Sequence, residues 1–92
     1  MLENEIKMMN KSDKKELIAR LSRIEGQIRG IIRMIENEES CELVIHQLAA
    51  ANQALHKAFV NVISKVIKNN VNYDSKSSEK LIYISDLLEK YL

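Results

Sequence analysis

Apolar side chains recur every three or four residues over one long stretch of the chain. They are Leu17, Leu21, Ile24, Ile28, Ile31 and Ile35, and on a helix they lie within about 40° of one line. This period predicts an amphipathic helix over residues 12–37 with these side chains as its core face. Ser12 is the expected N-cap, and Asn37 is the expected helix stop.

The remaining sequence also favours helices. The 92 residues contain no proline and two glycines, a composition typical of helices joined by short links. A second apolar repeat predicts a helix over residues 40–69, and a third predicts a shorter helix over residues 77–91. We therefore expect an all-α, three-helix protomer, with a mobile arm over residues 1–11 and one helical domain over residues 12–92.

Three helices of these lengths cannot bury all of their apolar surface against one another. A helix of 30 residues is about 45 Å long, and its neighbours are expected to have about 25 and 15 residues. A second protomer must cover the remainder, so we expect a homo-oligomer. Asn52, at the edge of the second apolar face, is suited to fix the register of that contact by a paired hydrogen bond.

Two glycines interrupt the first helix on the side opposite its core face. Gly26 and Gly30 lie about 180–220° from Leu17. Each costs about 0.5–1 kcal/mol relative to alanine in a helix interior, so the pair predicts a close approach to bare backbone; the alternative is a merely solvated face. The polar residues at the edges of this face are Arg23, Gln27, Arg29 and Arg33.

Charge is segregated along the chain although the net charge is only +1. Residues 1–35 carry eight Lys or Arg against five Asp or Glu, residues 36–42 carry four acids and no base, and residues 57–70 carry three lysines and no acid. Two basic surfaces thus flank an acidic corner. Such surfaces are either solvated helix faces or contacts for a polyanion.

A longer pattern resembles a known family. The run RLSRIEGQIRGI beginning at Arg20, followed by Met34, Cys41 and the run QLAAANQAL from Gln47, resembles the copper-sensing, nickel/cobalt-sensing and formaldehyde-sensing repressors (CsoR/RcnR/FrmR). The resemblance covers residues 12–70 without gaps. It implies an antiparallel four-helix-bundle dimer, a flat tetramer built from two such dimers, and a repressor that leaves its double-stranded operator DNA when a small inducer is sensed.

The resemblance makes Arg20 and Lys57 the leading DNA-contact candidates. From the helical wheel we add Arg23, Gln27, Arg29 and Arg33 as supporting candidates. Clustered cations neutralise phosphates despite a low net charge. The sequence contains no helix-turn-helix, zinc finger or basic zipper, which favours readout of the DNA backbone and shape.

The expected inducer site is incomplete. In the copper branch of the family, a cysteine at the position of Cys41 is joined by a histidine and a second cysteine, and those positions are Val66 and Asn70 here. Valine cannot bind Cu(I), and an amide binds it weakly. Cys41 is left as the candidate inducer-sensing residue: a reactive thiol, a ligand of Cu(I) or another transition metal in an incomplete set, or a small apolar residue at an interface.

The two histidines do not complete a metal site. His46 and His56 do not share a face with Cys41 at helical spacing; His46 is expected at the surface, and His56 at the margin of an interface. No cofactor is therefore assigned with certainty.

Other classes of protein fit less well. The chain has no acid–base pair with a nucleophile and no phosphate-binding loop, so we do not expect an enzyme. The single cysteine and the absence of a long apolar run predict a cytoplasmic protein without a membrane partner. The alternative to a repressor is a helical oligomerisation or scaffold module that does not bind DNA.

Overall fold

The computed structural model of the chain describes residues 9–71 and 77–91. Within these ranges the chain forms three helices and no strand: α2 over Lys11–Glu36, α3 over Cys41–Asn70 and α4 over Ser77–Tyr91. The predicted all-α class is confirmed. The bounds of α2 and α3 are each shifted by one residue from the sequence-based ranges.

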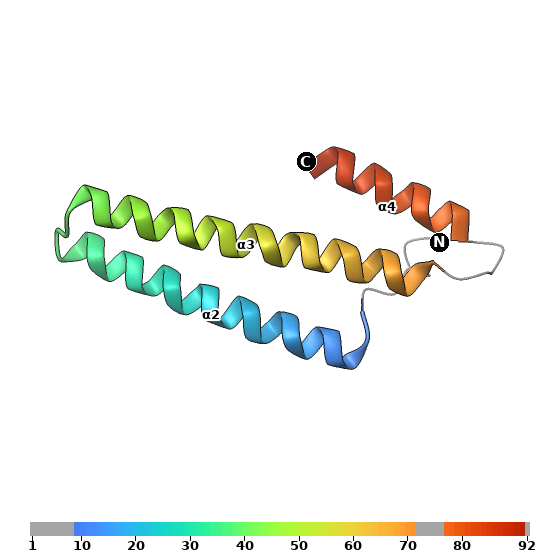
Figure 1. Cartoon of the computed structure of the whole chain (residues 1–92), viewed down its shortest axis with the longest axis horizontal. Helices are drawn as coiled ribbons and strands as arrows, with labels where there is room; N and C mark the ends of the chain where they lie inside the picture. Colours follow the sequence, from blue (N-terminus) through green and yellow to red (C-terminus); the bar gives the residue numbers. More distant parts are fainter. Residues whose placement is uncertain (1–8, 72–76, 92) are drawn as a thin grey trace.

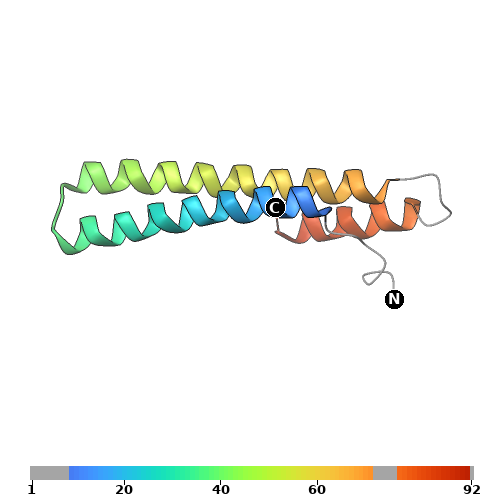
Figure 2. The ribbon, with the colours of Figure 1, turned by 90° about the horizontal axis from the view of Figure 1, so that it is seen from below.

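The helices make an elongated molecule with principal extents of 57 × 27 × 18 Å. α2 and α3 run antiparallel over most of their length, and α4 folds back along the second half of α3, on the other side from α2 (Figure 1). In the view turned by 90°, α2 and α4 both lie below α3 (Figure 2), so the two helices pack on different faces of α3 that are not directly opposite. None of the described helices is long and apolar enough to cross a membrane.

Most of the predicted arm, residues 1–11, is not described by the structure. Residues 1–8 lie outside the described residues, but Met9 packs against the α2–α3 core and Lys11 is already helical. The N-cap of α2 is Asn10, not Ser12: the Asn10 Oδ1 accepts a 2.8 Å hydrogen bond from the Asp13 N–H. Asparagine and serine cap helices about equally well, so sequence alone did not distinguish them.

The turn between α2 and α3 is closed by backbone hydrogen bonds. Asn37 is the C-cap of α2, as expected, and the Glu39 N–H donates to the Met34 carbonyl at 3.0 Å. Glu38 has a φ of 55°, the left-handed conformation that such a stop requires, although glycine is the usual residue there. Ser40 then caps α3, accepting a hydrogen bond from the Leu43 N–H at 3.2 Å.

The buried seam between α2 and α3 is narrow. Leu17, Ile24 and Ala58 form the core cluster, with Ile31 and Ala51 buried farther along the same pair of helices. The buried residues of α2 recur every seven residues, so one side chain per two turns is fully covered by α3. The rest of the apolar stripe is not.

Half of the predicted core face of α2 is therefore exposed in the protomer, where the sequence predicts that a second protomer covers part of the apolar surface. Leu21, Ile28 and Ile35 are 41%, 46% and 57% exposed. Ile28 and Ile35, but not Leu21, form an apolar groove together with side chains of α3. Its lining residues are Ile24, Ile28, Ile31, Ile32, Ile35, Leu48, Ala51, Asn52 and Leu55. The stripe is wider than one neighbouring helix can cover.

The accessible surface area of the protomer is also larger than that of a compact protein of the same mass. The chain exposes 7242 Å², whereas a compact protein of 10.6 kDa is expected to expose about 5,500 Å². The radius of gyration is 17.4 Å, against about 12 Å for a compact domain of this length. The protomer has the shape of one part of a larger bundle.

The new N-cap gives a first prediction. We expect Asn10→Ala to lower the free energy of unfolding by about 1 kcal/mol, because one orphan N–H of α2 loses its acceptor. Ser12→Ala, two residues inside the helix, should be neutral or slightly stabilising. Thermal unfolding at fixed protein concentration compares the two, and a larger loss in Ser12→Ala would contradict the assignment.

Candidate nucleic-acid interface

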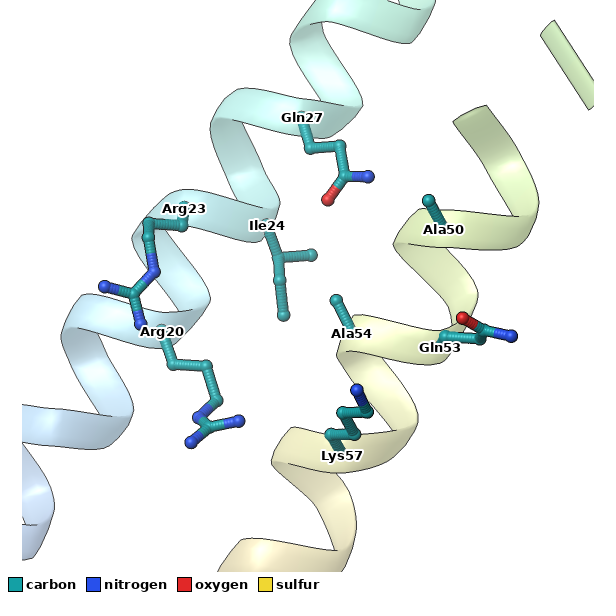
Figure 3. A pocket seen from close by; sticks show the side chains of 8 residues that line it. All are labelled: Arg20, Arg23, Ile24, Gln27, Ala50, Gln53, Ala54 and Lys57. Carbon is teal, nitrogen blue, oxygen red and sulfur yellow. The ribbon is translucent and has the colours of Figure 1, made fainter. Parts of the chain in front are cut away.

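A polar groove of about 380 Å³ lies between α2 and α3, on the other side of the buried seam from the apolar groove. Its rim carries Arg20, Arg23 and Gln27 from α2 and Gln53 and Lys57 from α3 (Figure 3). Its remaining lining residues are Ile24, Ala50 and Ala54. Among the described residues, no acidic side chain lines it. Arg20 extends toward α3, whereas Arg23 and Gln53 lie at the outer edges of the groove and point away from the facing helix (Figure 3). We refer to this surface as the basic groove.

The sequence builds the basic groove by helical spacing. Arg20, Arg23 and Gln27 lie at successive turns along one edge of the buried seam of α2, which brings them beside α3. Ala50 and Ala54 face them, and their short side chains leave the space open. Larger residues there would fill the hollow and separate the arginines from Lys57.

Arg20 is the most enclosed cation of the groove. Its side chain is 30% exposed, and its Nη2 lies 3.7 Å from the Glu16 Oε1 one turn earlier. The Nε is buried and has no hydrogen-bond partner. A guanidinium has five N–H donors, so Arg20 retains capacity to donate to an anion that enters the groove.

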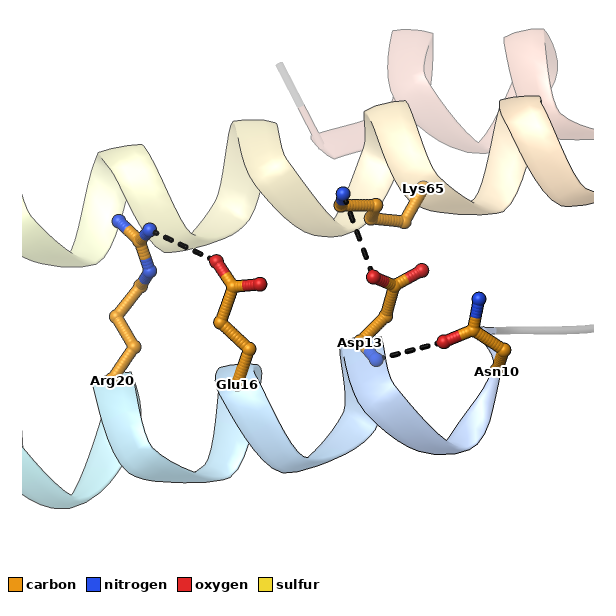
Figure 4. Close-up of polar contacts among 5 residues, drawn as sticks. All are labelled: Asn10, Asp13, Glu16, Arg20 and Lys65. Atoms are coloured by element: carbon orange, nitrogen blue, oxygen red, sulfur yellow. Dashed lines mark hydrogen bonds and ion pairs between the residues drawn. The ribbon is translucent and has the colours of Figure 1, made fainter.

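An ion pair joins the two helices beyond the Arg20 end of the groove. The Lys65 Nζ of α3 lies 3.5 Å from the Asp13 Oδ1 of α2, and both side chains are largely covered (Figure 4). The backbone N–H of Asp13 also donates a hydrogen bond to the Oδ1 of the N-cap residue Asn10. The Asp13–Lys65 ion pair thus holds the first turn of α2 against α3, one turn before Glu16 and two turns before Arg20.

Two of the predicted DNA-contact residues do not join the basic groove. Arg29 has a side chain that is 64% exposed and lies 3.7 Å from the Glu25 carboxylate. Arg33 is exposed on the side of α2 away from α3. The structure therefore brings together Arg20, Arg23, Gln27 and Lys57 and leaves Arg29 and Arg33 on a separate surface.

Gln53 is the groove residue that the sequence-based candidates missed. It lies four residues before Lys57, hence on the same face of α3, and this spacing is the signal that identifies it. Sequence reasoning included the neutral amide Gln27 of α2, but on α3 it selected only Lys57 and did not extend that face to Gln53.

The candidate sensing residues are far apart in the protomer. Cys41 is the exposed first residue of α3, whereas Val66 lies 25 residues later, about 38 Å along the helix. Asn70 is only 1% exposed, and its Nδ2 donates a 2.7 Å hydrogen bond to the Val66 carbonyl. Within one protomer these residues cannot converge on an ion.

The histidines lie outside any metal cluster. The His46 Nε2 lies 3.8 Å from the Glu42 carboxylate at the surface, and His56 lines a shallow hollow with Asn52, Gln53 and Lys57. In the part of the chain that the structure describes, no three His, Cys, Asp or Glu side chains are grouped to hold a metal ion. The Cu(I) ligand set of the copper branch does not fit these residues.

Comparisons with known proteins agree with this architecture. The family model for the metal-sensitive transcriptional repressor matches residues 13–90. The copper-sensing transcriptional repressor CsoR of Bacillus subtilis is 33% identical over 91 residues, covering 96% of this chain and 90% of the relative. The transcriptional repressor RcnR of Citrobacter koseri is 29% identical over 83 residues, covering 87% and 92%.

A third relative matches a shorter stretch. The copper-sensing transcriptional repressor RicR of Mycobacterium tuberculosis is 40% identical over 52 residues, which cover 56% of this chain and 54% of the relative. No solved structure gives a significant match.

Proposed function

Because this chain belongs to the metal-sensitive transcriptional repressor family, and is therefore a transcriptional repressor rather than an enzyme, we propose that it holds operator DNA in the basic groove. The observation that carries this proposal is the meeting of Arg20, Arg23 and Lys57 in one acid-free hollow, with Gln27 as a neutral donor. Duplex DNA presents a phosphate charge every 1.7 Å or so along its axis, and clustered cations bind it by releasing counterions.

We expect fewer contacts to base edges than to the sugar–phosphate backbone of the DNA. The groove offers two amides and three cations, which suit phosphate and sugar atoms as well as base edges. Because no helix of a recognised reading motif is present, we expect the operator to be selected largely by its shape and deformability.

Salt dependence tests the DNA contact. We expect Arg20→Gln and Lys57→Gln each to weaken operator binding and to reduce the slope of log K against log salt by about one, because each loses one phosphate contact. Lys90→Gln, which removes the same charge from α4, should leave both quantities unchanged. Binding is measured by electrophoretic shift with the promoter region of the chain's own gene.

The same experiment tests the rival function. If the wild-type chain shows no saturable binding to that DNA even at low salt, the protein is a helical oligomerisation module and the DNA proposal is wrong.

We also propose that the apolar groove is covered by a second copy of the chain, giving an antiparallel four-helix bundle and then a tetramer of two such dimers. Supporting this are the exposed Ile28 and Ile32 beside Leu48 and Leu55, and a surface roughly 1,700 Å² larger than that of a compact protein of this mass. If each of two copies buries that excess, the interface totals roughly 3,400 Å², which lies in the range of obligate homodimers.

Charge placed in the apolar groove tests the assembly. We expect Ile28→Glu to yield monomeric or unfolded protein at micromolar concentration, since burying a carboxylate in an apolar contact is costly. Ile82→Glu, at an even more exposed isoleucine of α4, is the control and should retain the wild-type mass. Sedimentation velocity measures both, and an Ile28→Glu variant of unchanged mass would contradict the proposal.

For the inducer, we propose that Cys41 is the sensing residue, acting either as a reactive thiol or as one ligand of a transition-metal ion whose other donors come from a partner chain. It is the chain's single thiol, and it is exposed where α3 begins. Thiolate is both the nucleophile and the soft ligand that these chemistries require.

Release from DNA tests the role of Cys41. Cu(I), Ni(II), formaldehyde and a persulfide donor are each added to the wild-type complex with operator DNA, and mass spectrometry detects any adduct. We expect Cys41→Ala to bind DNA normally but not to release it with the agent that releases the wild type. Full release of Cys41→Ala by that agent would exclude Cys41 as the sensor.

A further inference from the structure

The side of α2 that faces away from α3 is basic and bare. We call it the outer face; it consists of Lys15, Ala19, Ser22, Gly26, Arg29, Gly30 and Arg33, which lie about 120–220° from Leu17 around the helix. None of these residues is acidic or large and apolar, and none is buried. Glu16 and Glu25 lie beyond its two edges. The cations of the outer face are Lys15, Arg29 and Arg33, and the Arg29 guanidinium lies 3.7 Å from the Glu25 carboxylate at its edge.

The glycines of the outer face have no use within the protomer. Both are helical with negative φ, so the backbone conformation does not require glycine. A methyl group added at Gly30 would have no neighbour within 4 Å outside the local helix backbone, and one added at Gly26 would lie 3.9 Å from the Arg29 Nη2. Alanine would fit both positions and would favour the helix. Among residues 9–71 and 77–91, no contact therefore requires glycine at these two positions.

Charge and continuity identify the partner. Arg23 borders the outer face at about 240° and also lines the basic groove, so this one cation joins the two surfaces, beside Glu16 at about 260°. The apolar groove lies toward the other edge of α2, which leaves the outer face free when a second copy covers that groove. A surface with cations around an uncovered main chain complements a polyanion that must come close.

We propose that the outer face of α2 is a second DNA-contact surface, on which the sugar–phosphate backbone of the same duplex lies against Gly26 and Gly30 and is held by Arg33 and Arg29. The proposal rests on the proposed function, since it assumes that the basic groove binds duplex DNA. It divides the six predicted DNA-contact residues into two sets. Arg20, Gln27 and Lys57 act in the groove, Arg29 and Arg33 act on the outer face, and Arg23 lies where the two surfaces meet.

Replacing both glycines by alanine distinguishes a role in DNA binding from a role in the stability of the fold. The full-length double variant Gly26→Ala/Gly30→Ala should unfold a few degrees higher than the wild type, because alanine is the better helix former. It should keep the wild-type oligomeric mass. Its affinity for the operator should fall by about tenfold, because two methyl groups hold the duplex away from the main chain. Thermal unfolding, sedimentation velocity and electrophoretic shift at fixed salt measure the three quantities.

Charge removal gives a second, independent readout. Arg33→Gln should reduce the slope of log K against log salt by about 0.9, the value for one lost phosphate contact, while Lys90→Gln on α4 should leave the slope unchanged. Wild-type affinity in the double alanine variant, or a slope in Arg33→Gln equal to that of Lys90→Gln, would overturn the proposal. A changed oligomeric mass in the alanine variant would also overturn it, because it would place a second protein copy on this face.

The two failures are distinguishable. If Arg20→Gln and Lys57→Gln weaken binding while the glycine and Arg33 variants do not, the groove is the whole DNA contact and only the second surface is rejected. If the wild-type chain itself does not bind the operator, the proposed function is rejected, and this inference is rejected with it.

Discussion

The narrow seam between α2 and α3 is the constraint on which the other features of the protein depend. α2 buries one apolar side chain every seven residues, at Leu17, Ile24 and Ile31. The buried residues of α3 in the same seam are Ala51 and Ala58. Because alanine side chains are short, they allow the backbones of α2 and α3 to lie close together, but they bury only a narrow part of the apolar stripe of α2. Cationic and amide side chains therefore lie along one side of the seam and aliphatic side chains along the other, so a single pair of helices has two faces of opposite character.

Sequence periodicity was sufficient for the helices but not for the allocation of their faces. The repeat from Leu17 to Ile35 defines an apolar stripe correctly, yet a helical wheel of one helix does not say which part of a wide stripe the intrachain neighbour covers. The wheel places Leu21 and Ile28 on the same face as Leu17 and Ile24, and only the position of α3 shows that it leaves the first two exposed. The N-cap differed for a simpler reason, because Asn10 and Ser12 are both good caps and lie two residues apart.

The same limitation applies to the candidate site. Residue type identified the cations, but only the position of α3 separates Arg20 and Arg23 from Arg29 and Arg33. Gln53 was missed because a neutral amide alone does not indicate a DNA contact. It becomes a candidate only when the structure places Lys57, on the same face of α3, opposite the arginines. The incomplete donor set for Cu(I) was readable in the sequence, since no packing converts Val66 into a ligand.

The proposed covering of the protomer's excess surface by a second copy has a consequence for how the protein behaves in a cell. When a chain buries too little on its own and a copy of itself supplies the missing contact, folding and association become one equilibrium governed by mass action. The folded fraction then rises with the number of chains present. For a repressor assembled in this way, a fall in synthesis would deplete the active form more than proportionally, so that the level of expression itself sets a threshold for occupancy of the operator.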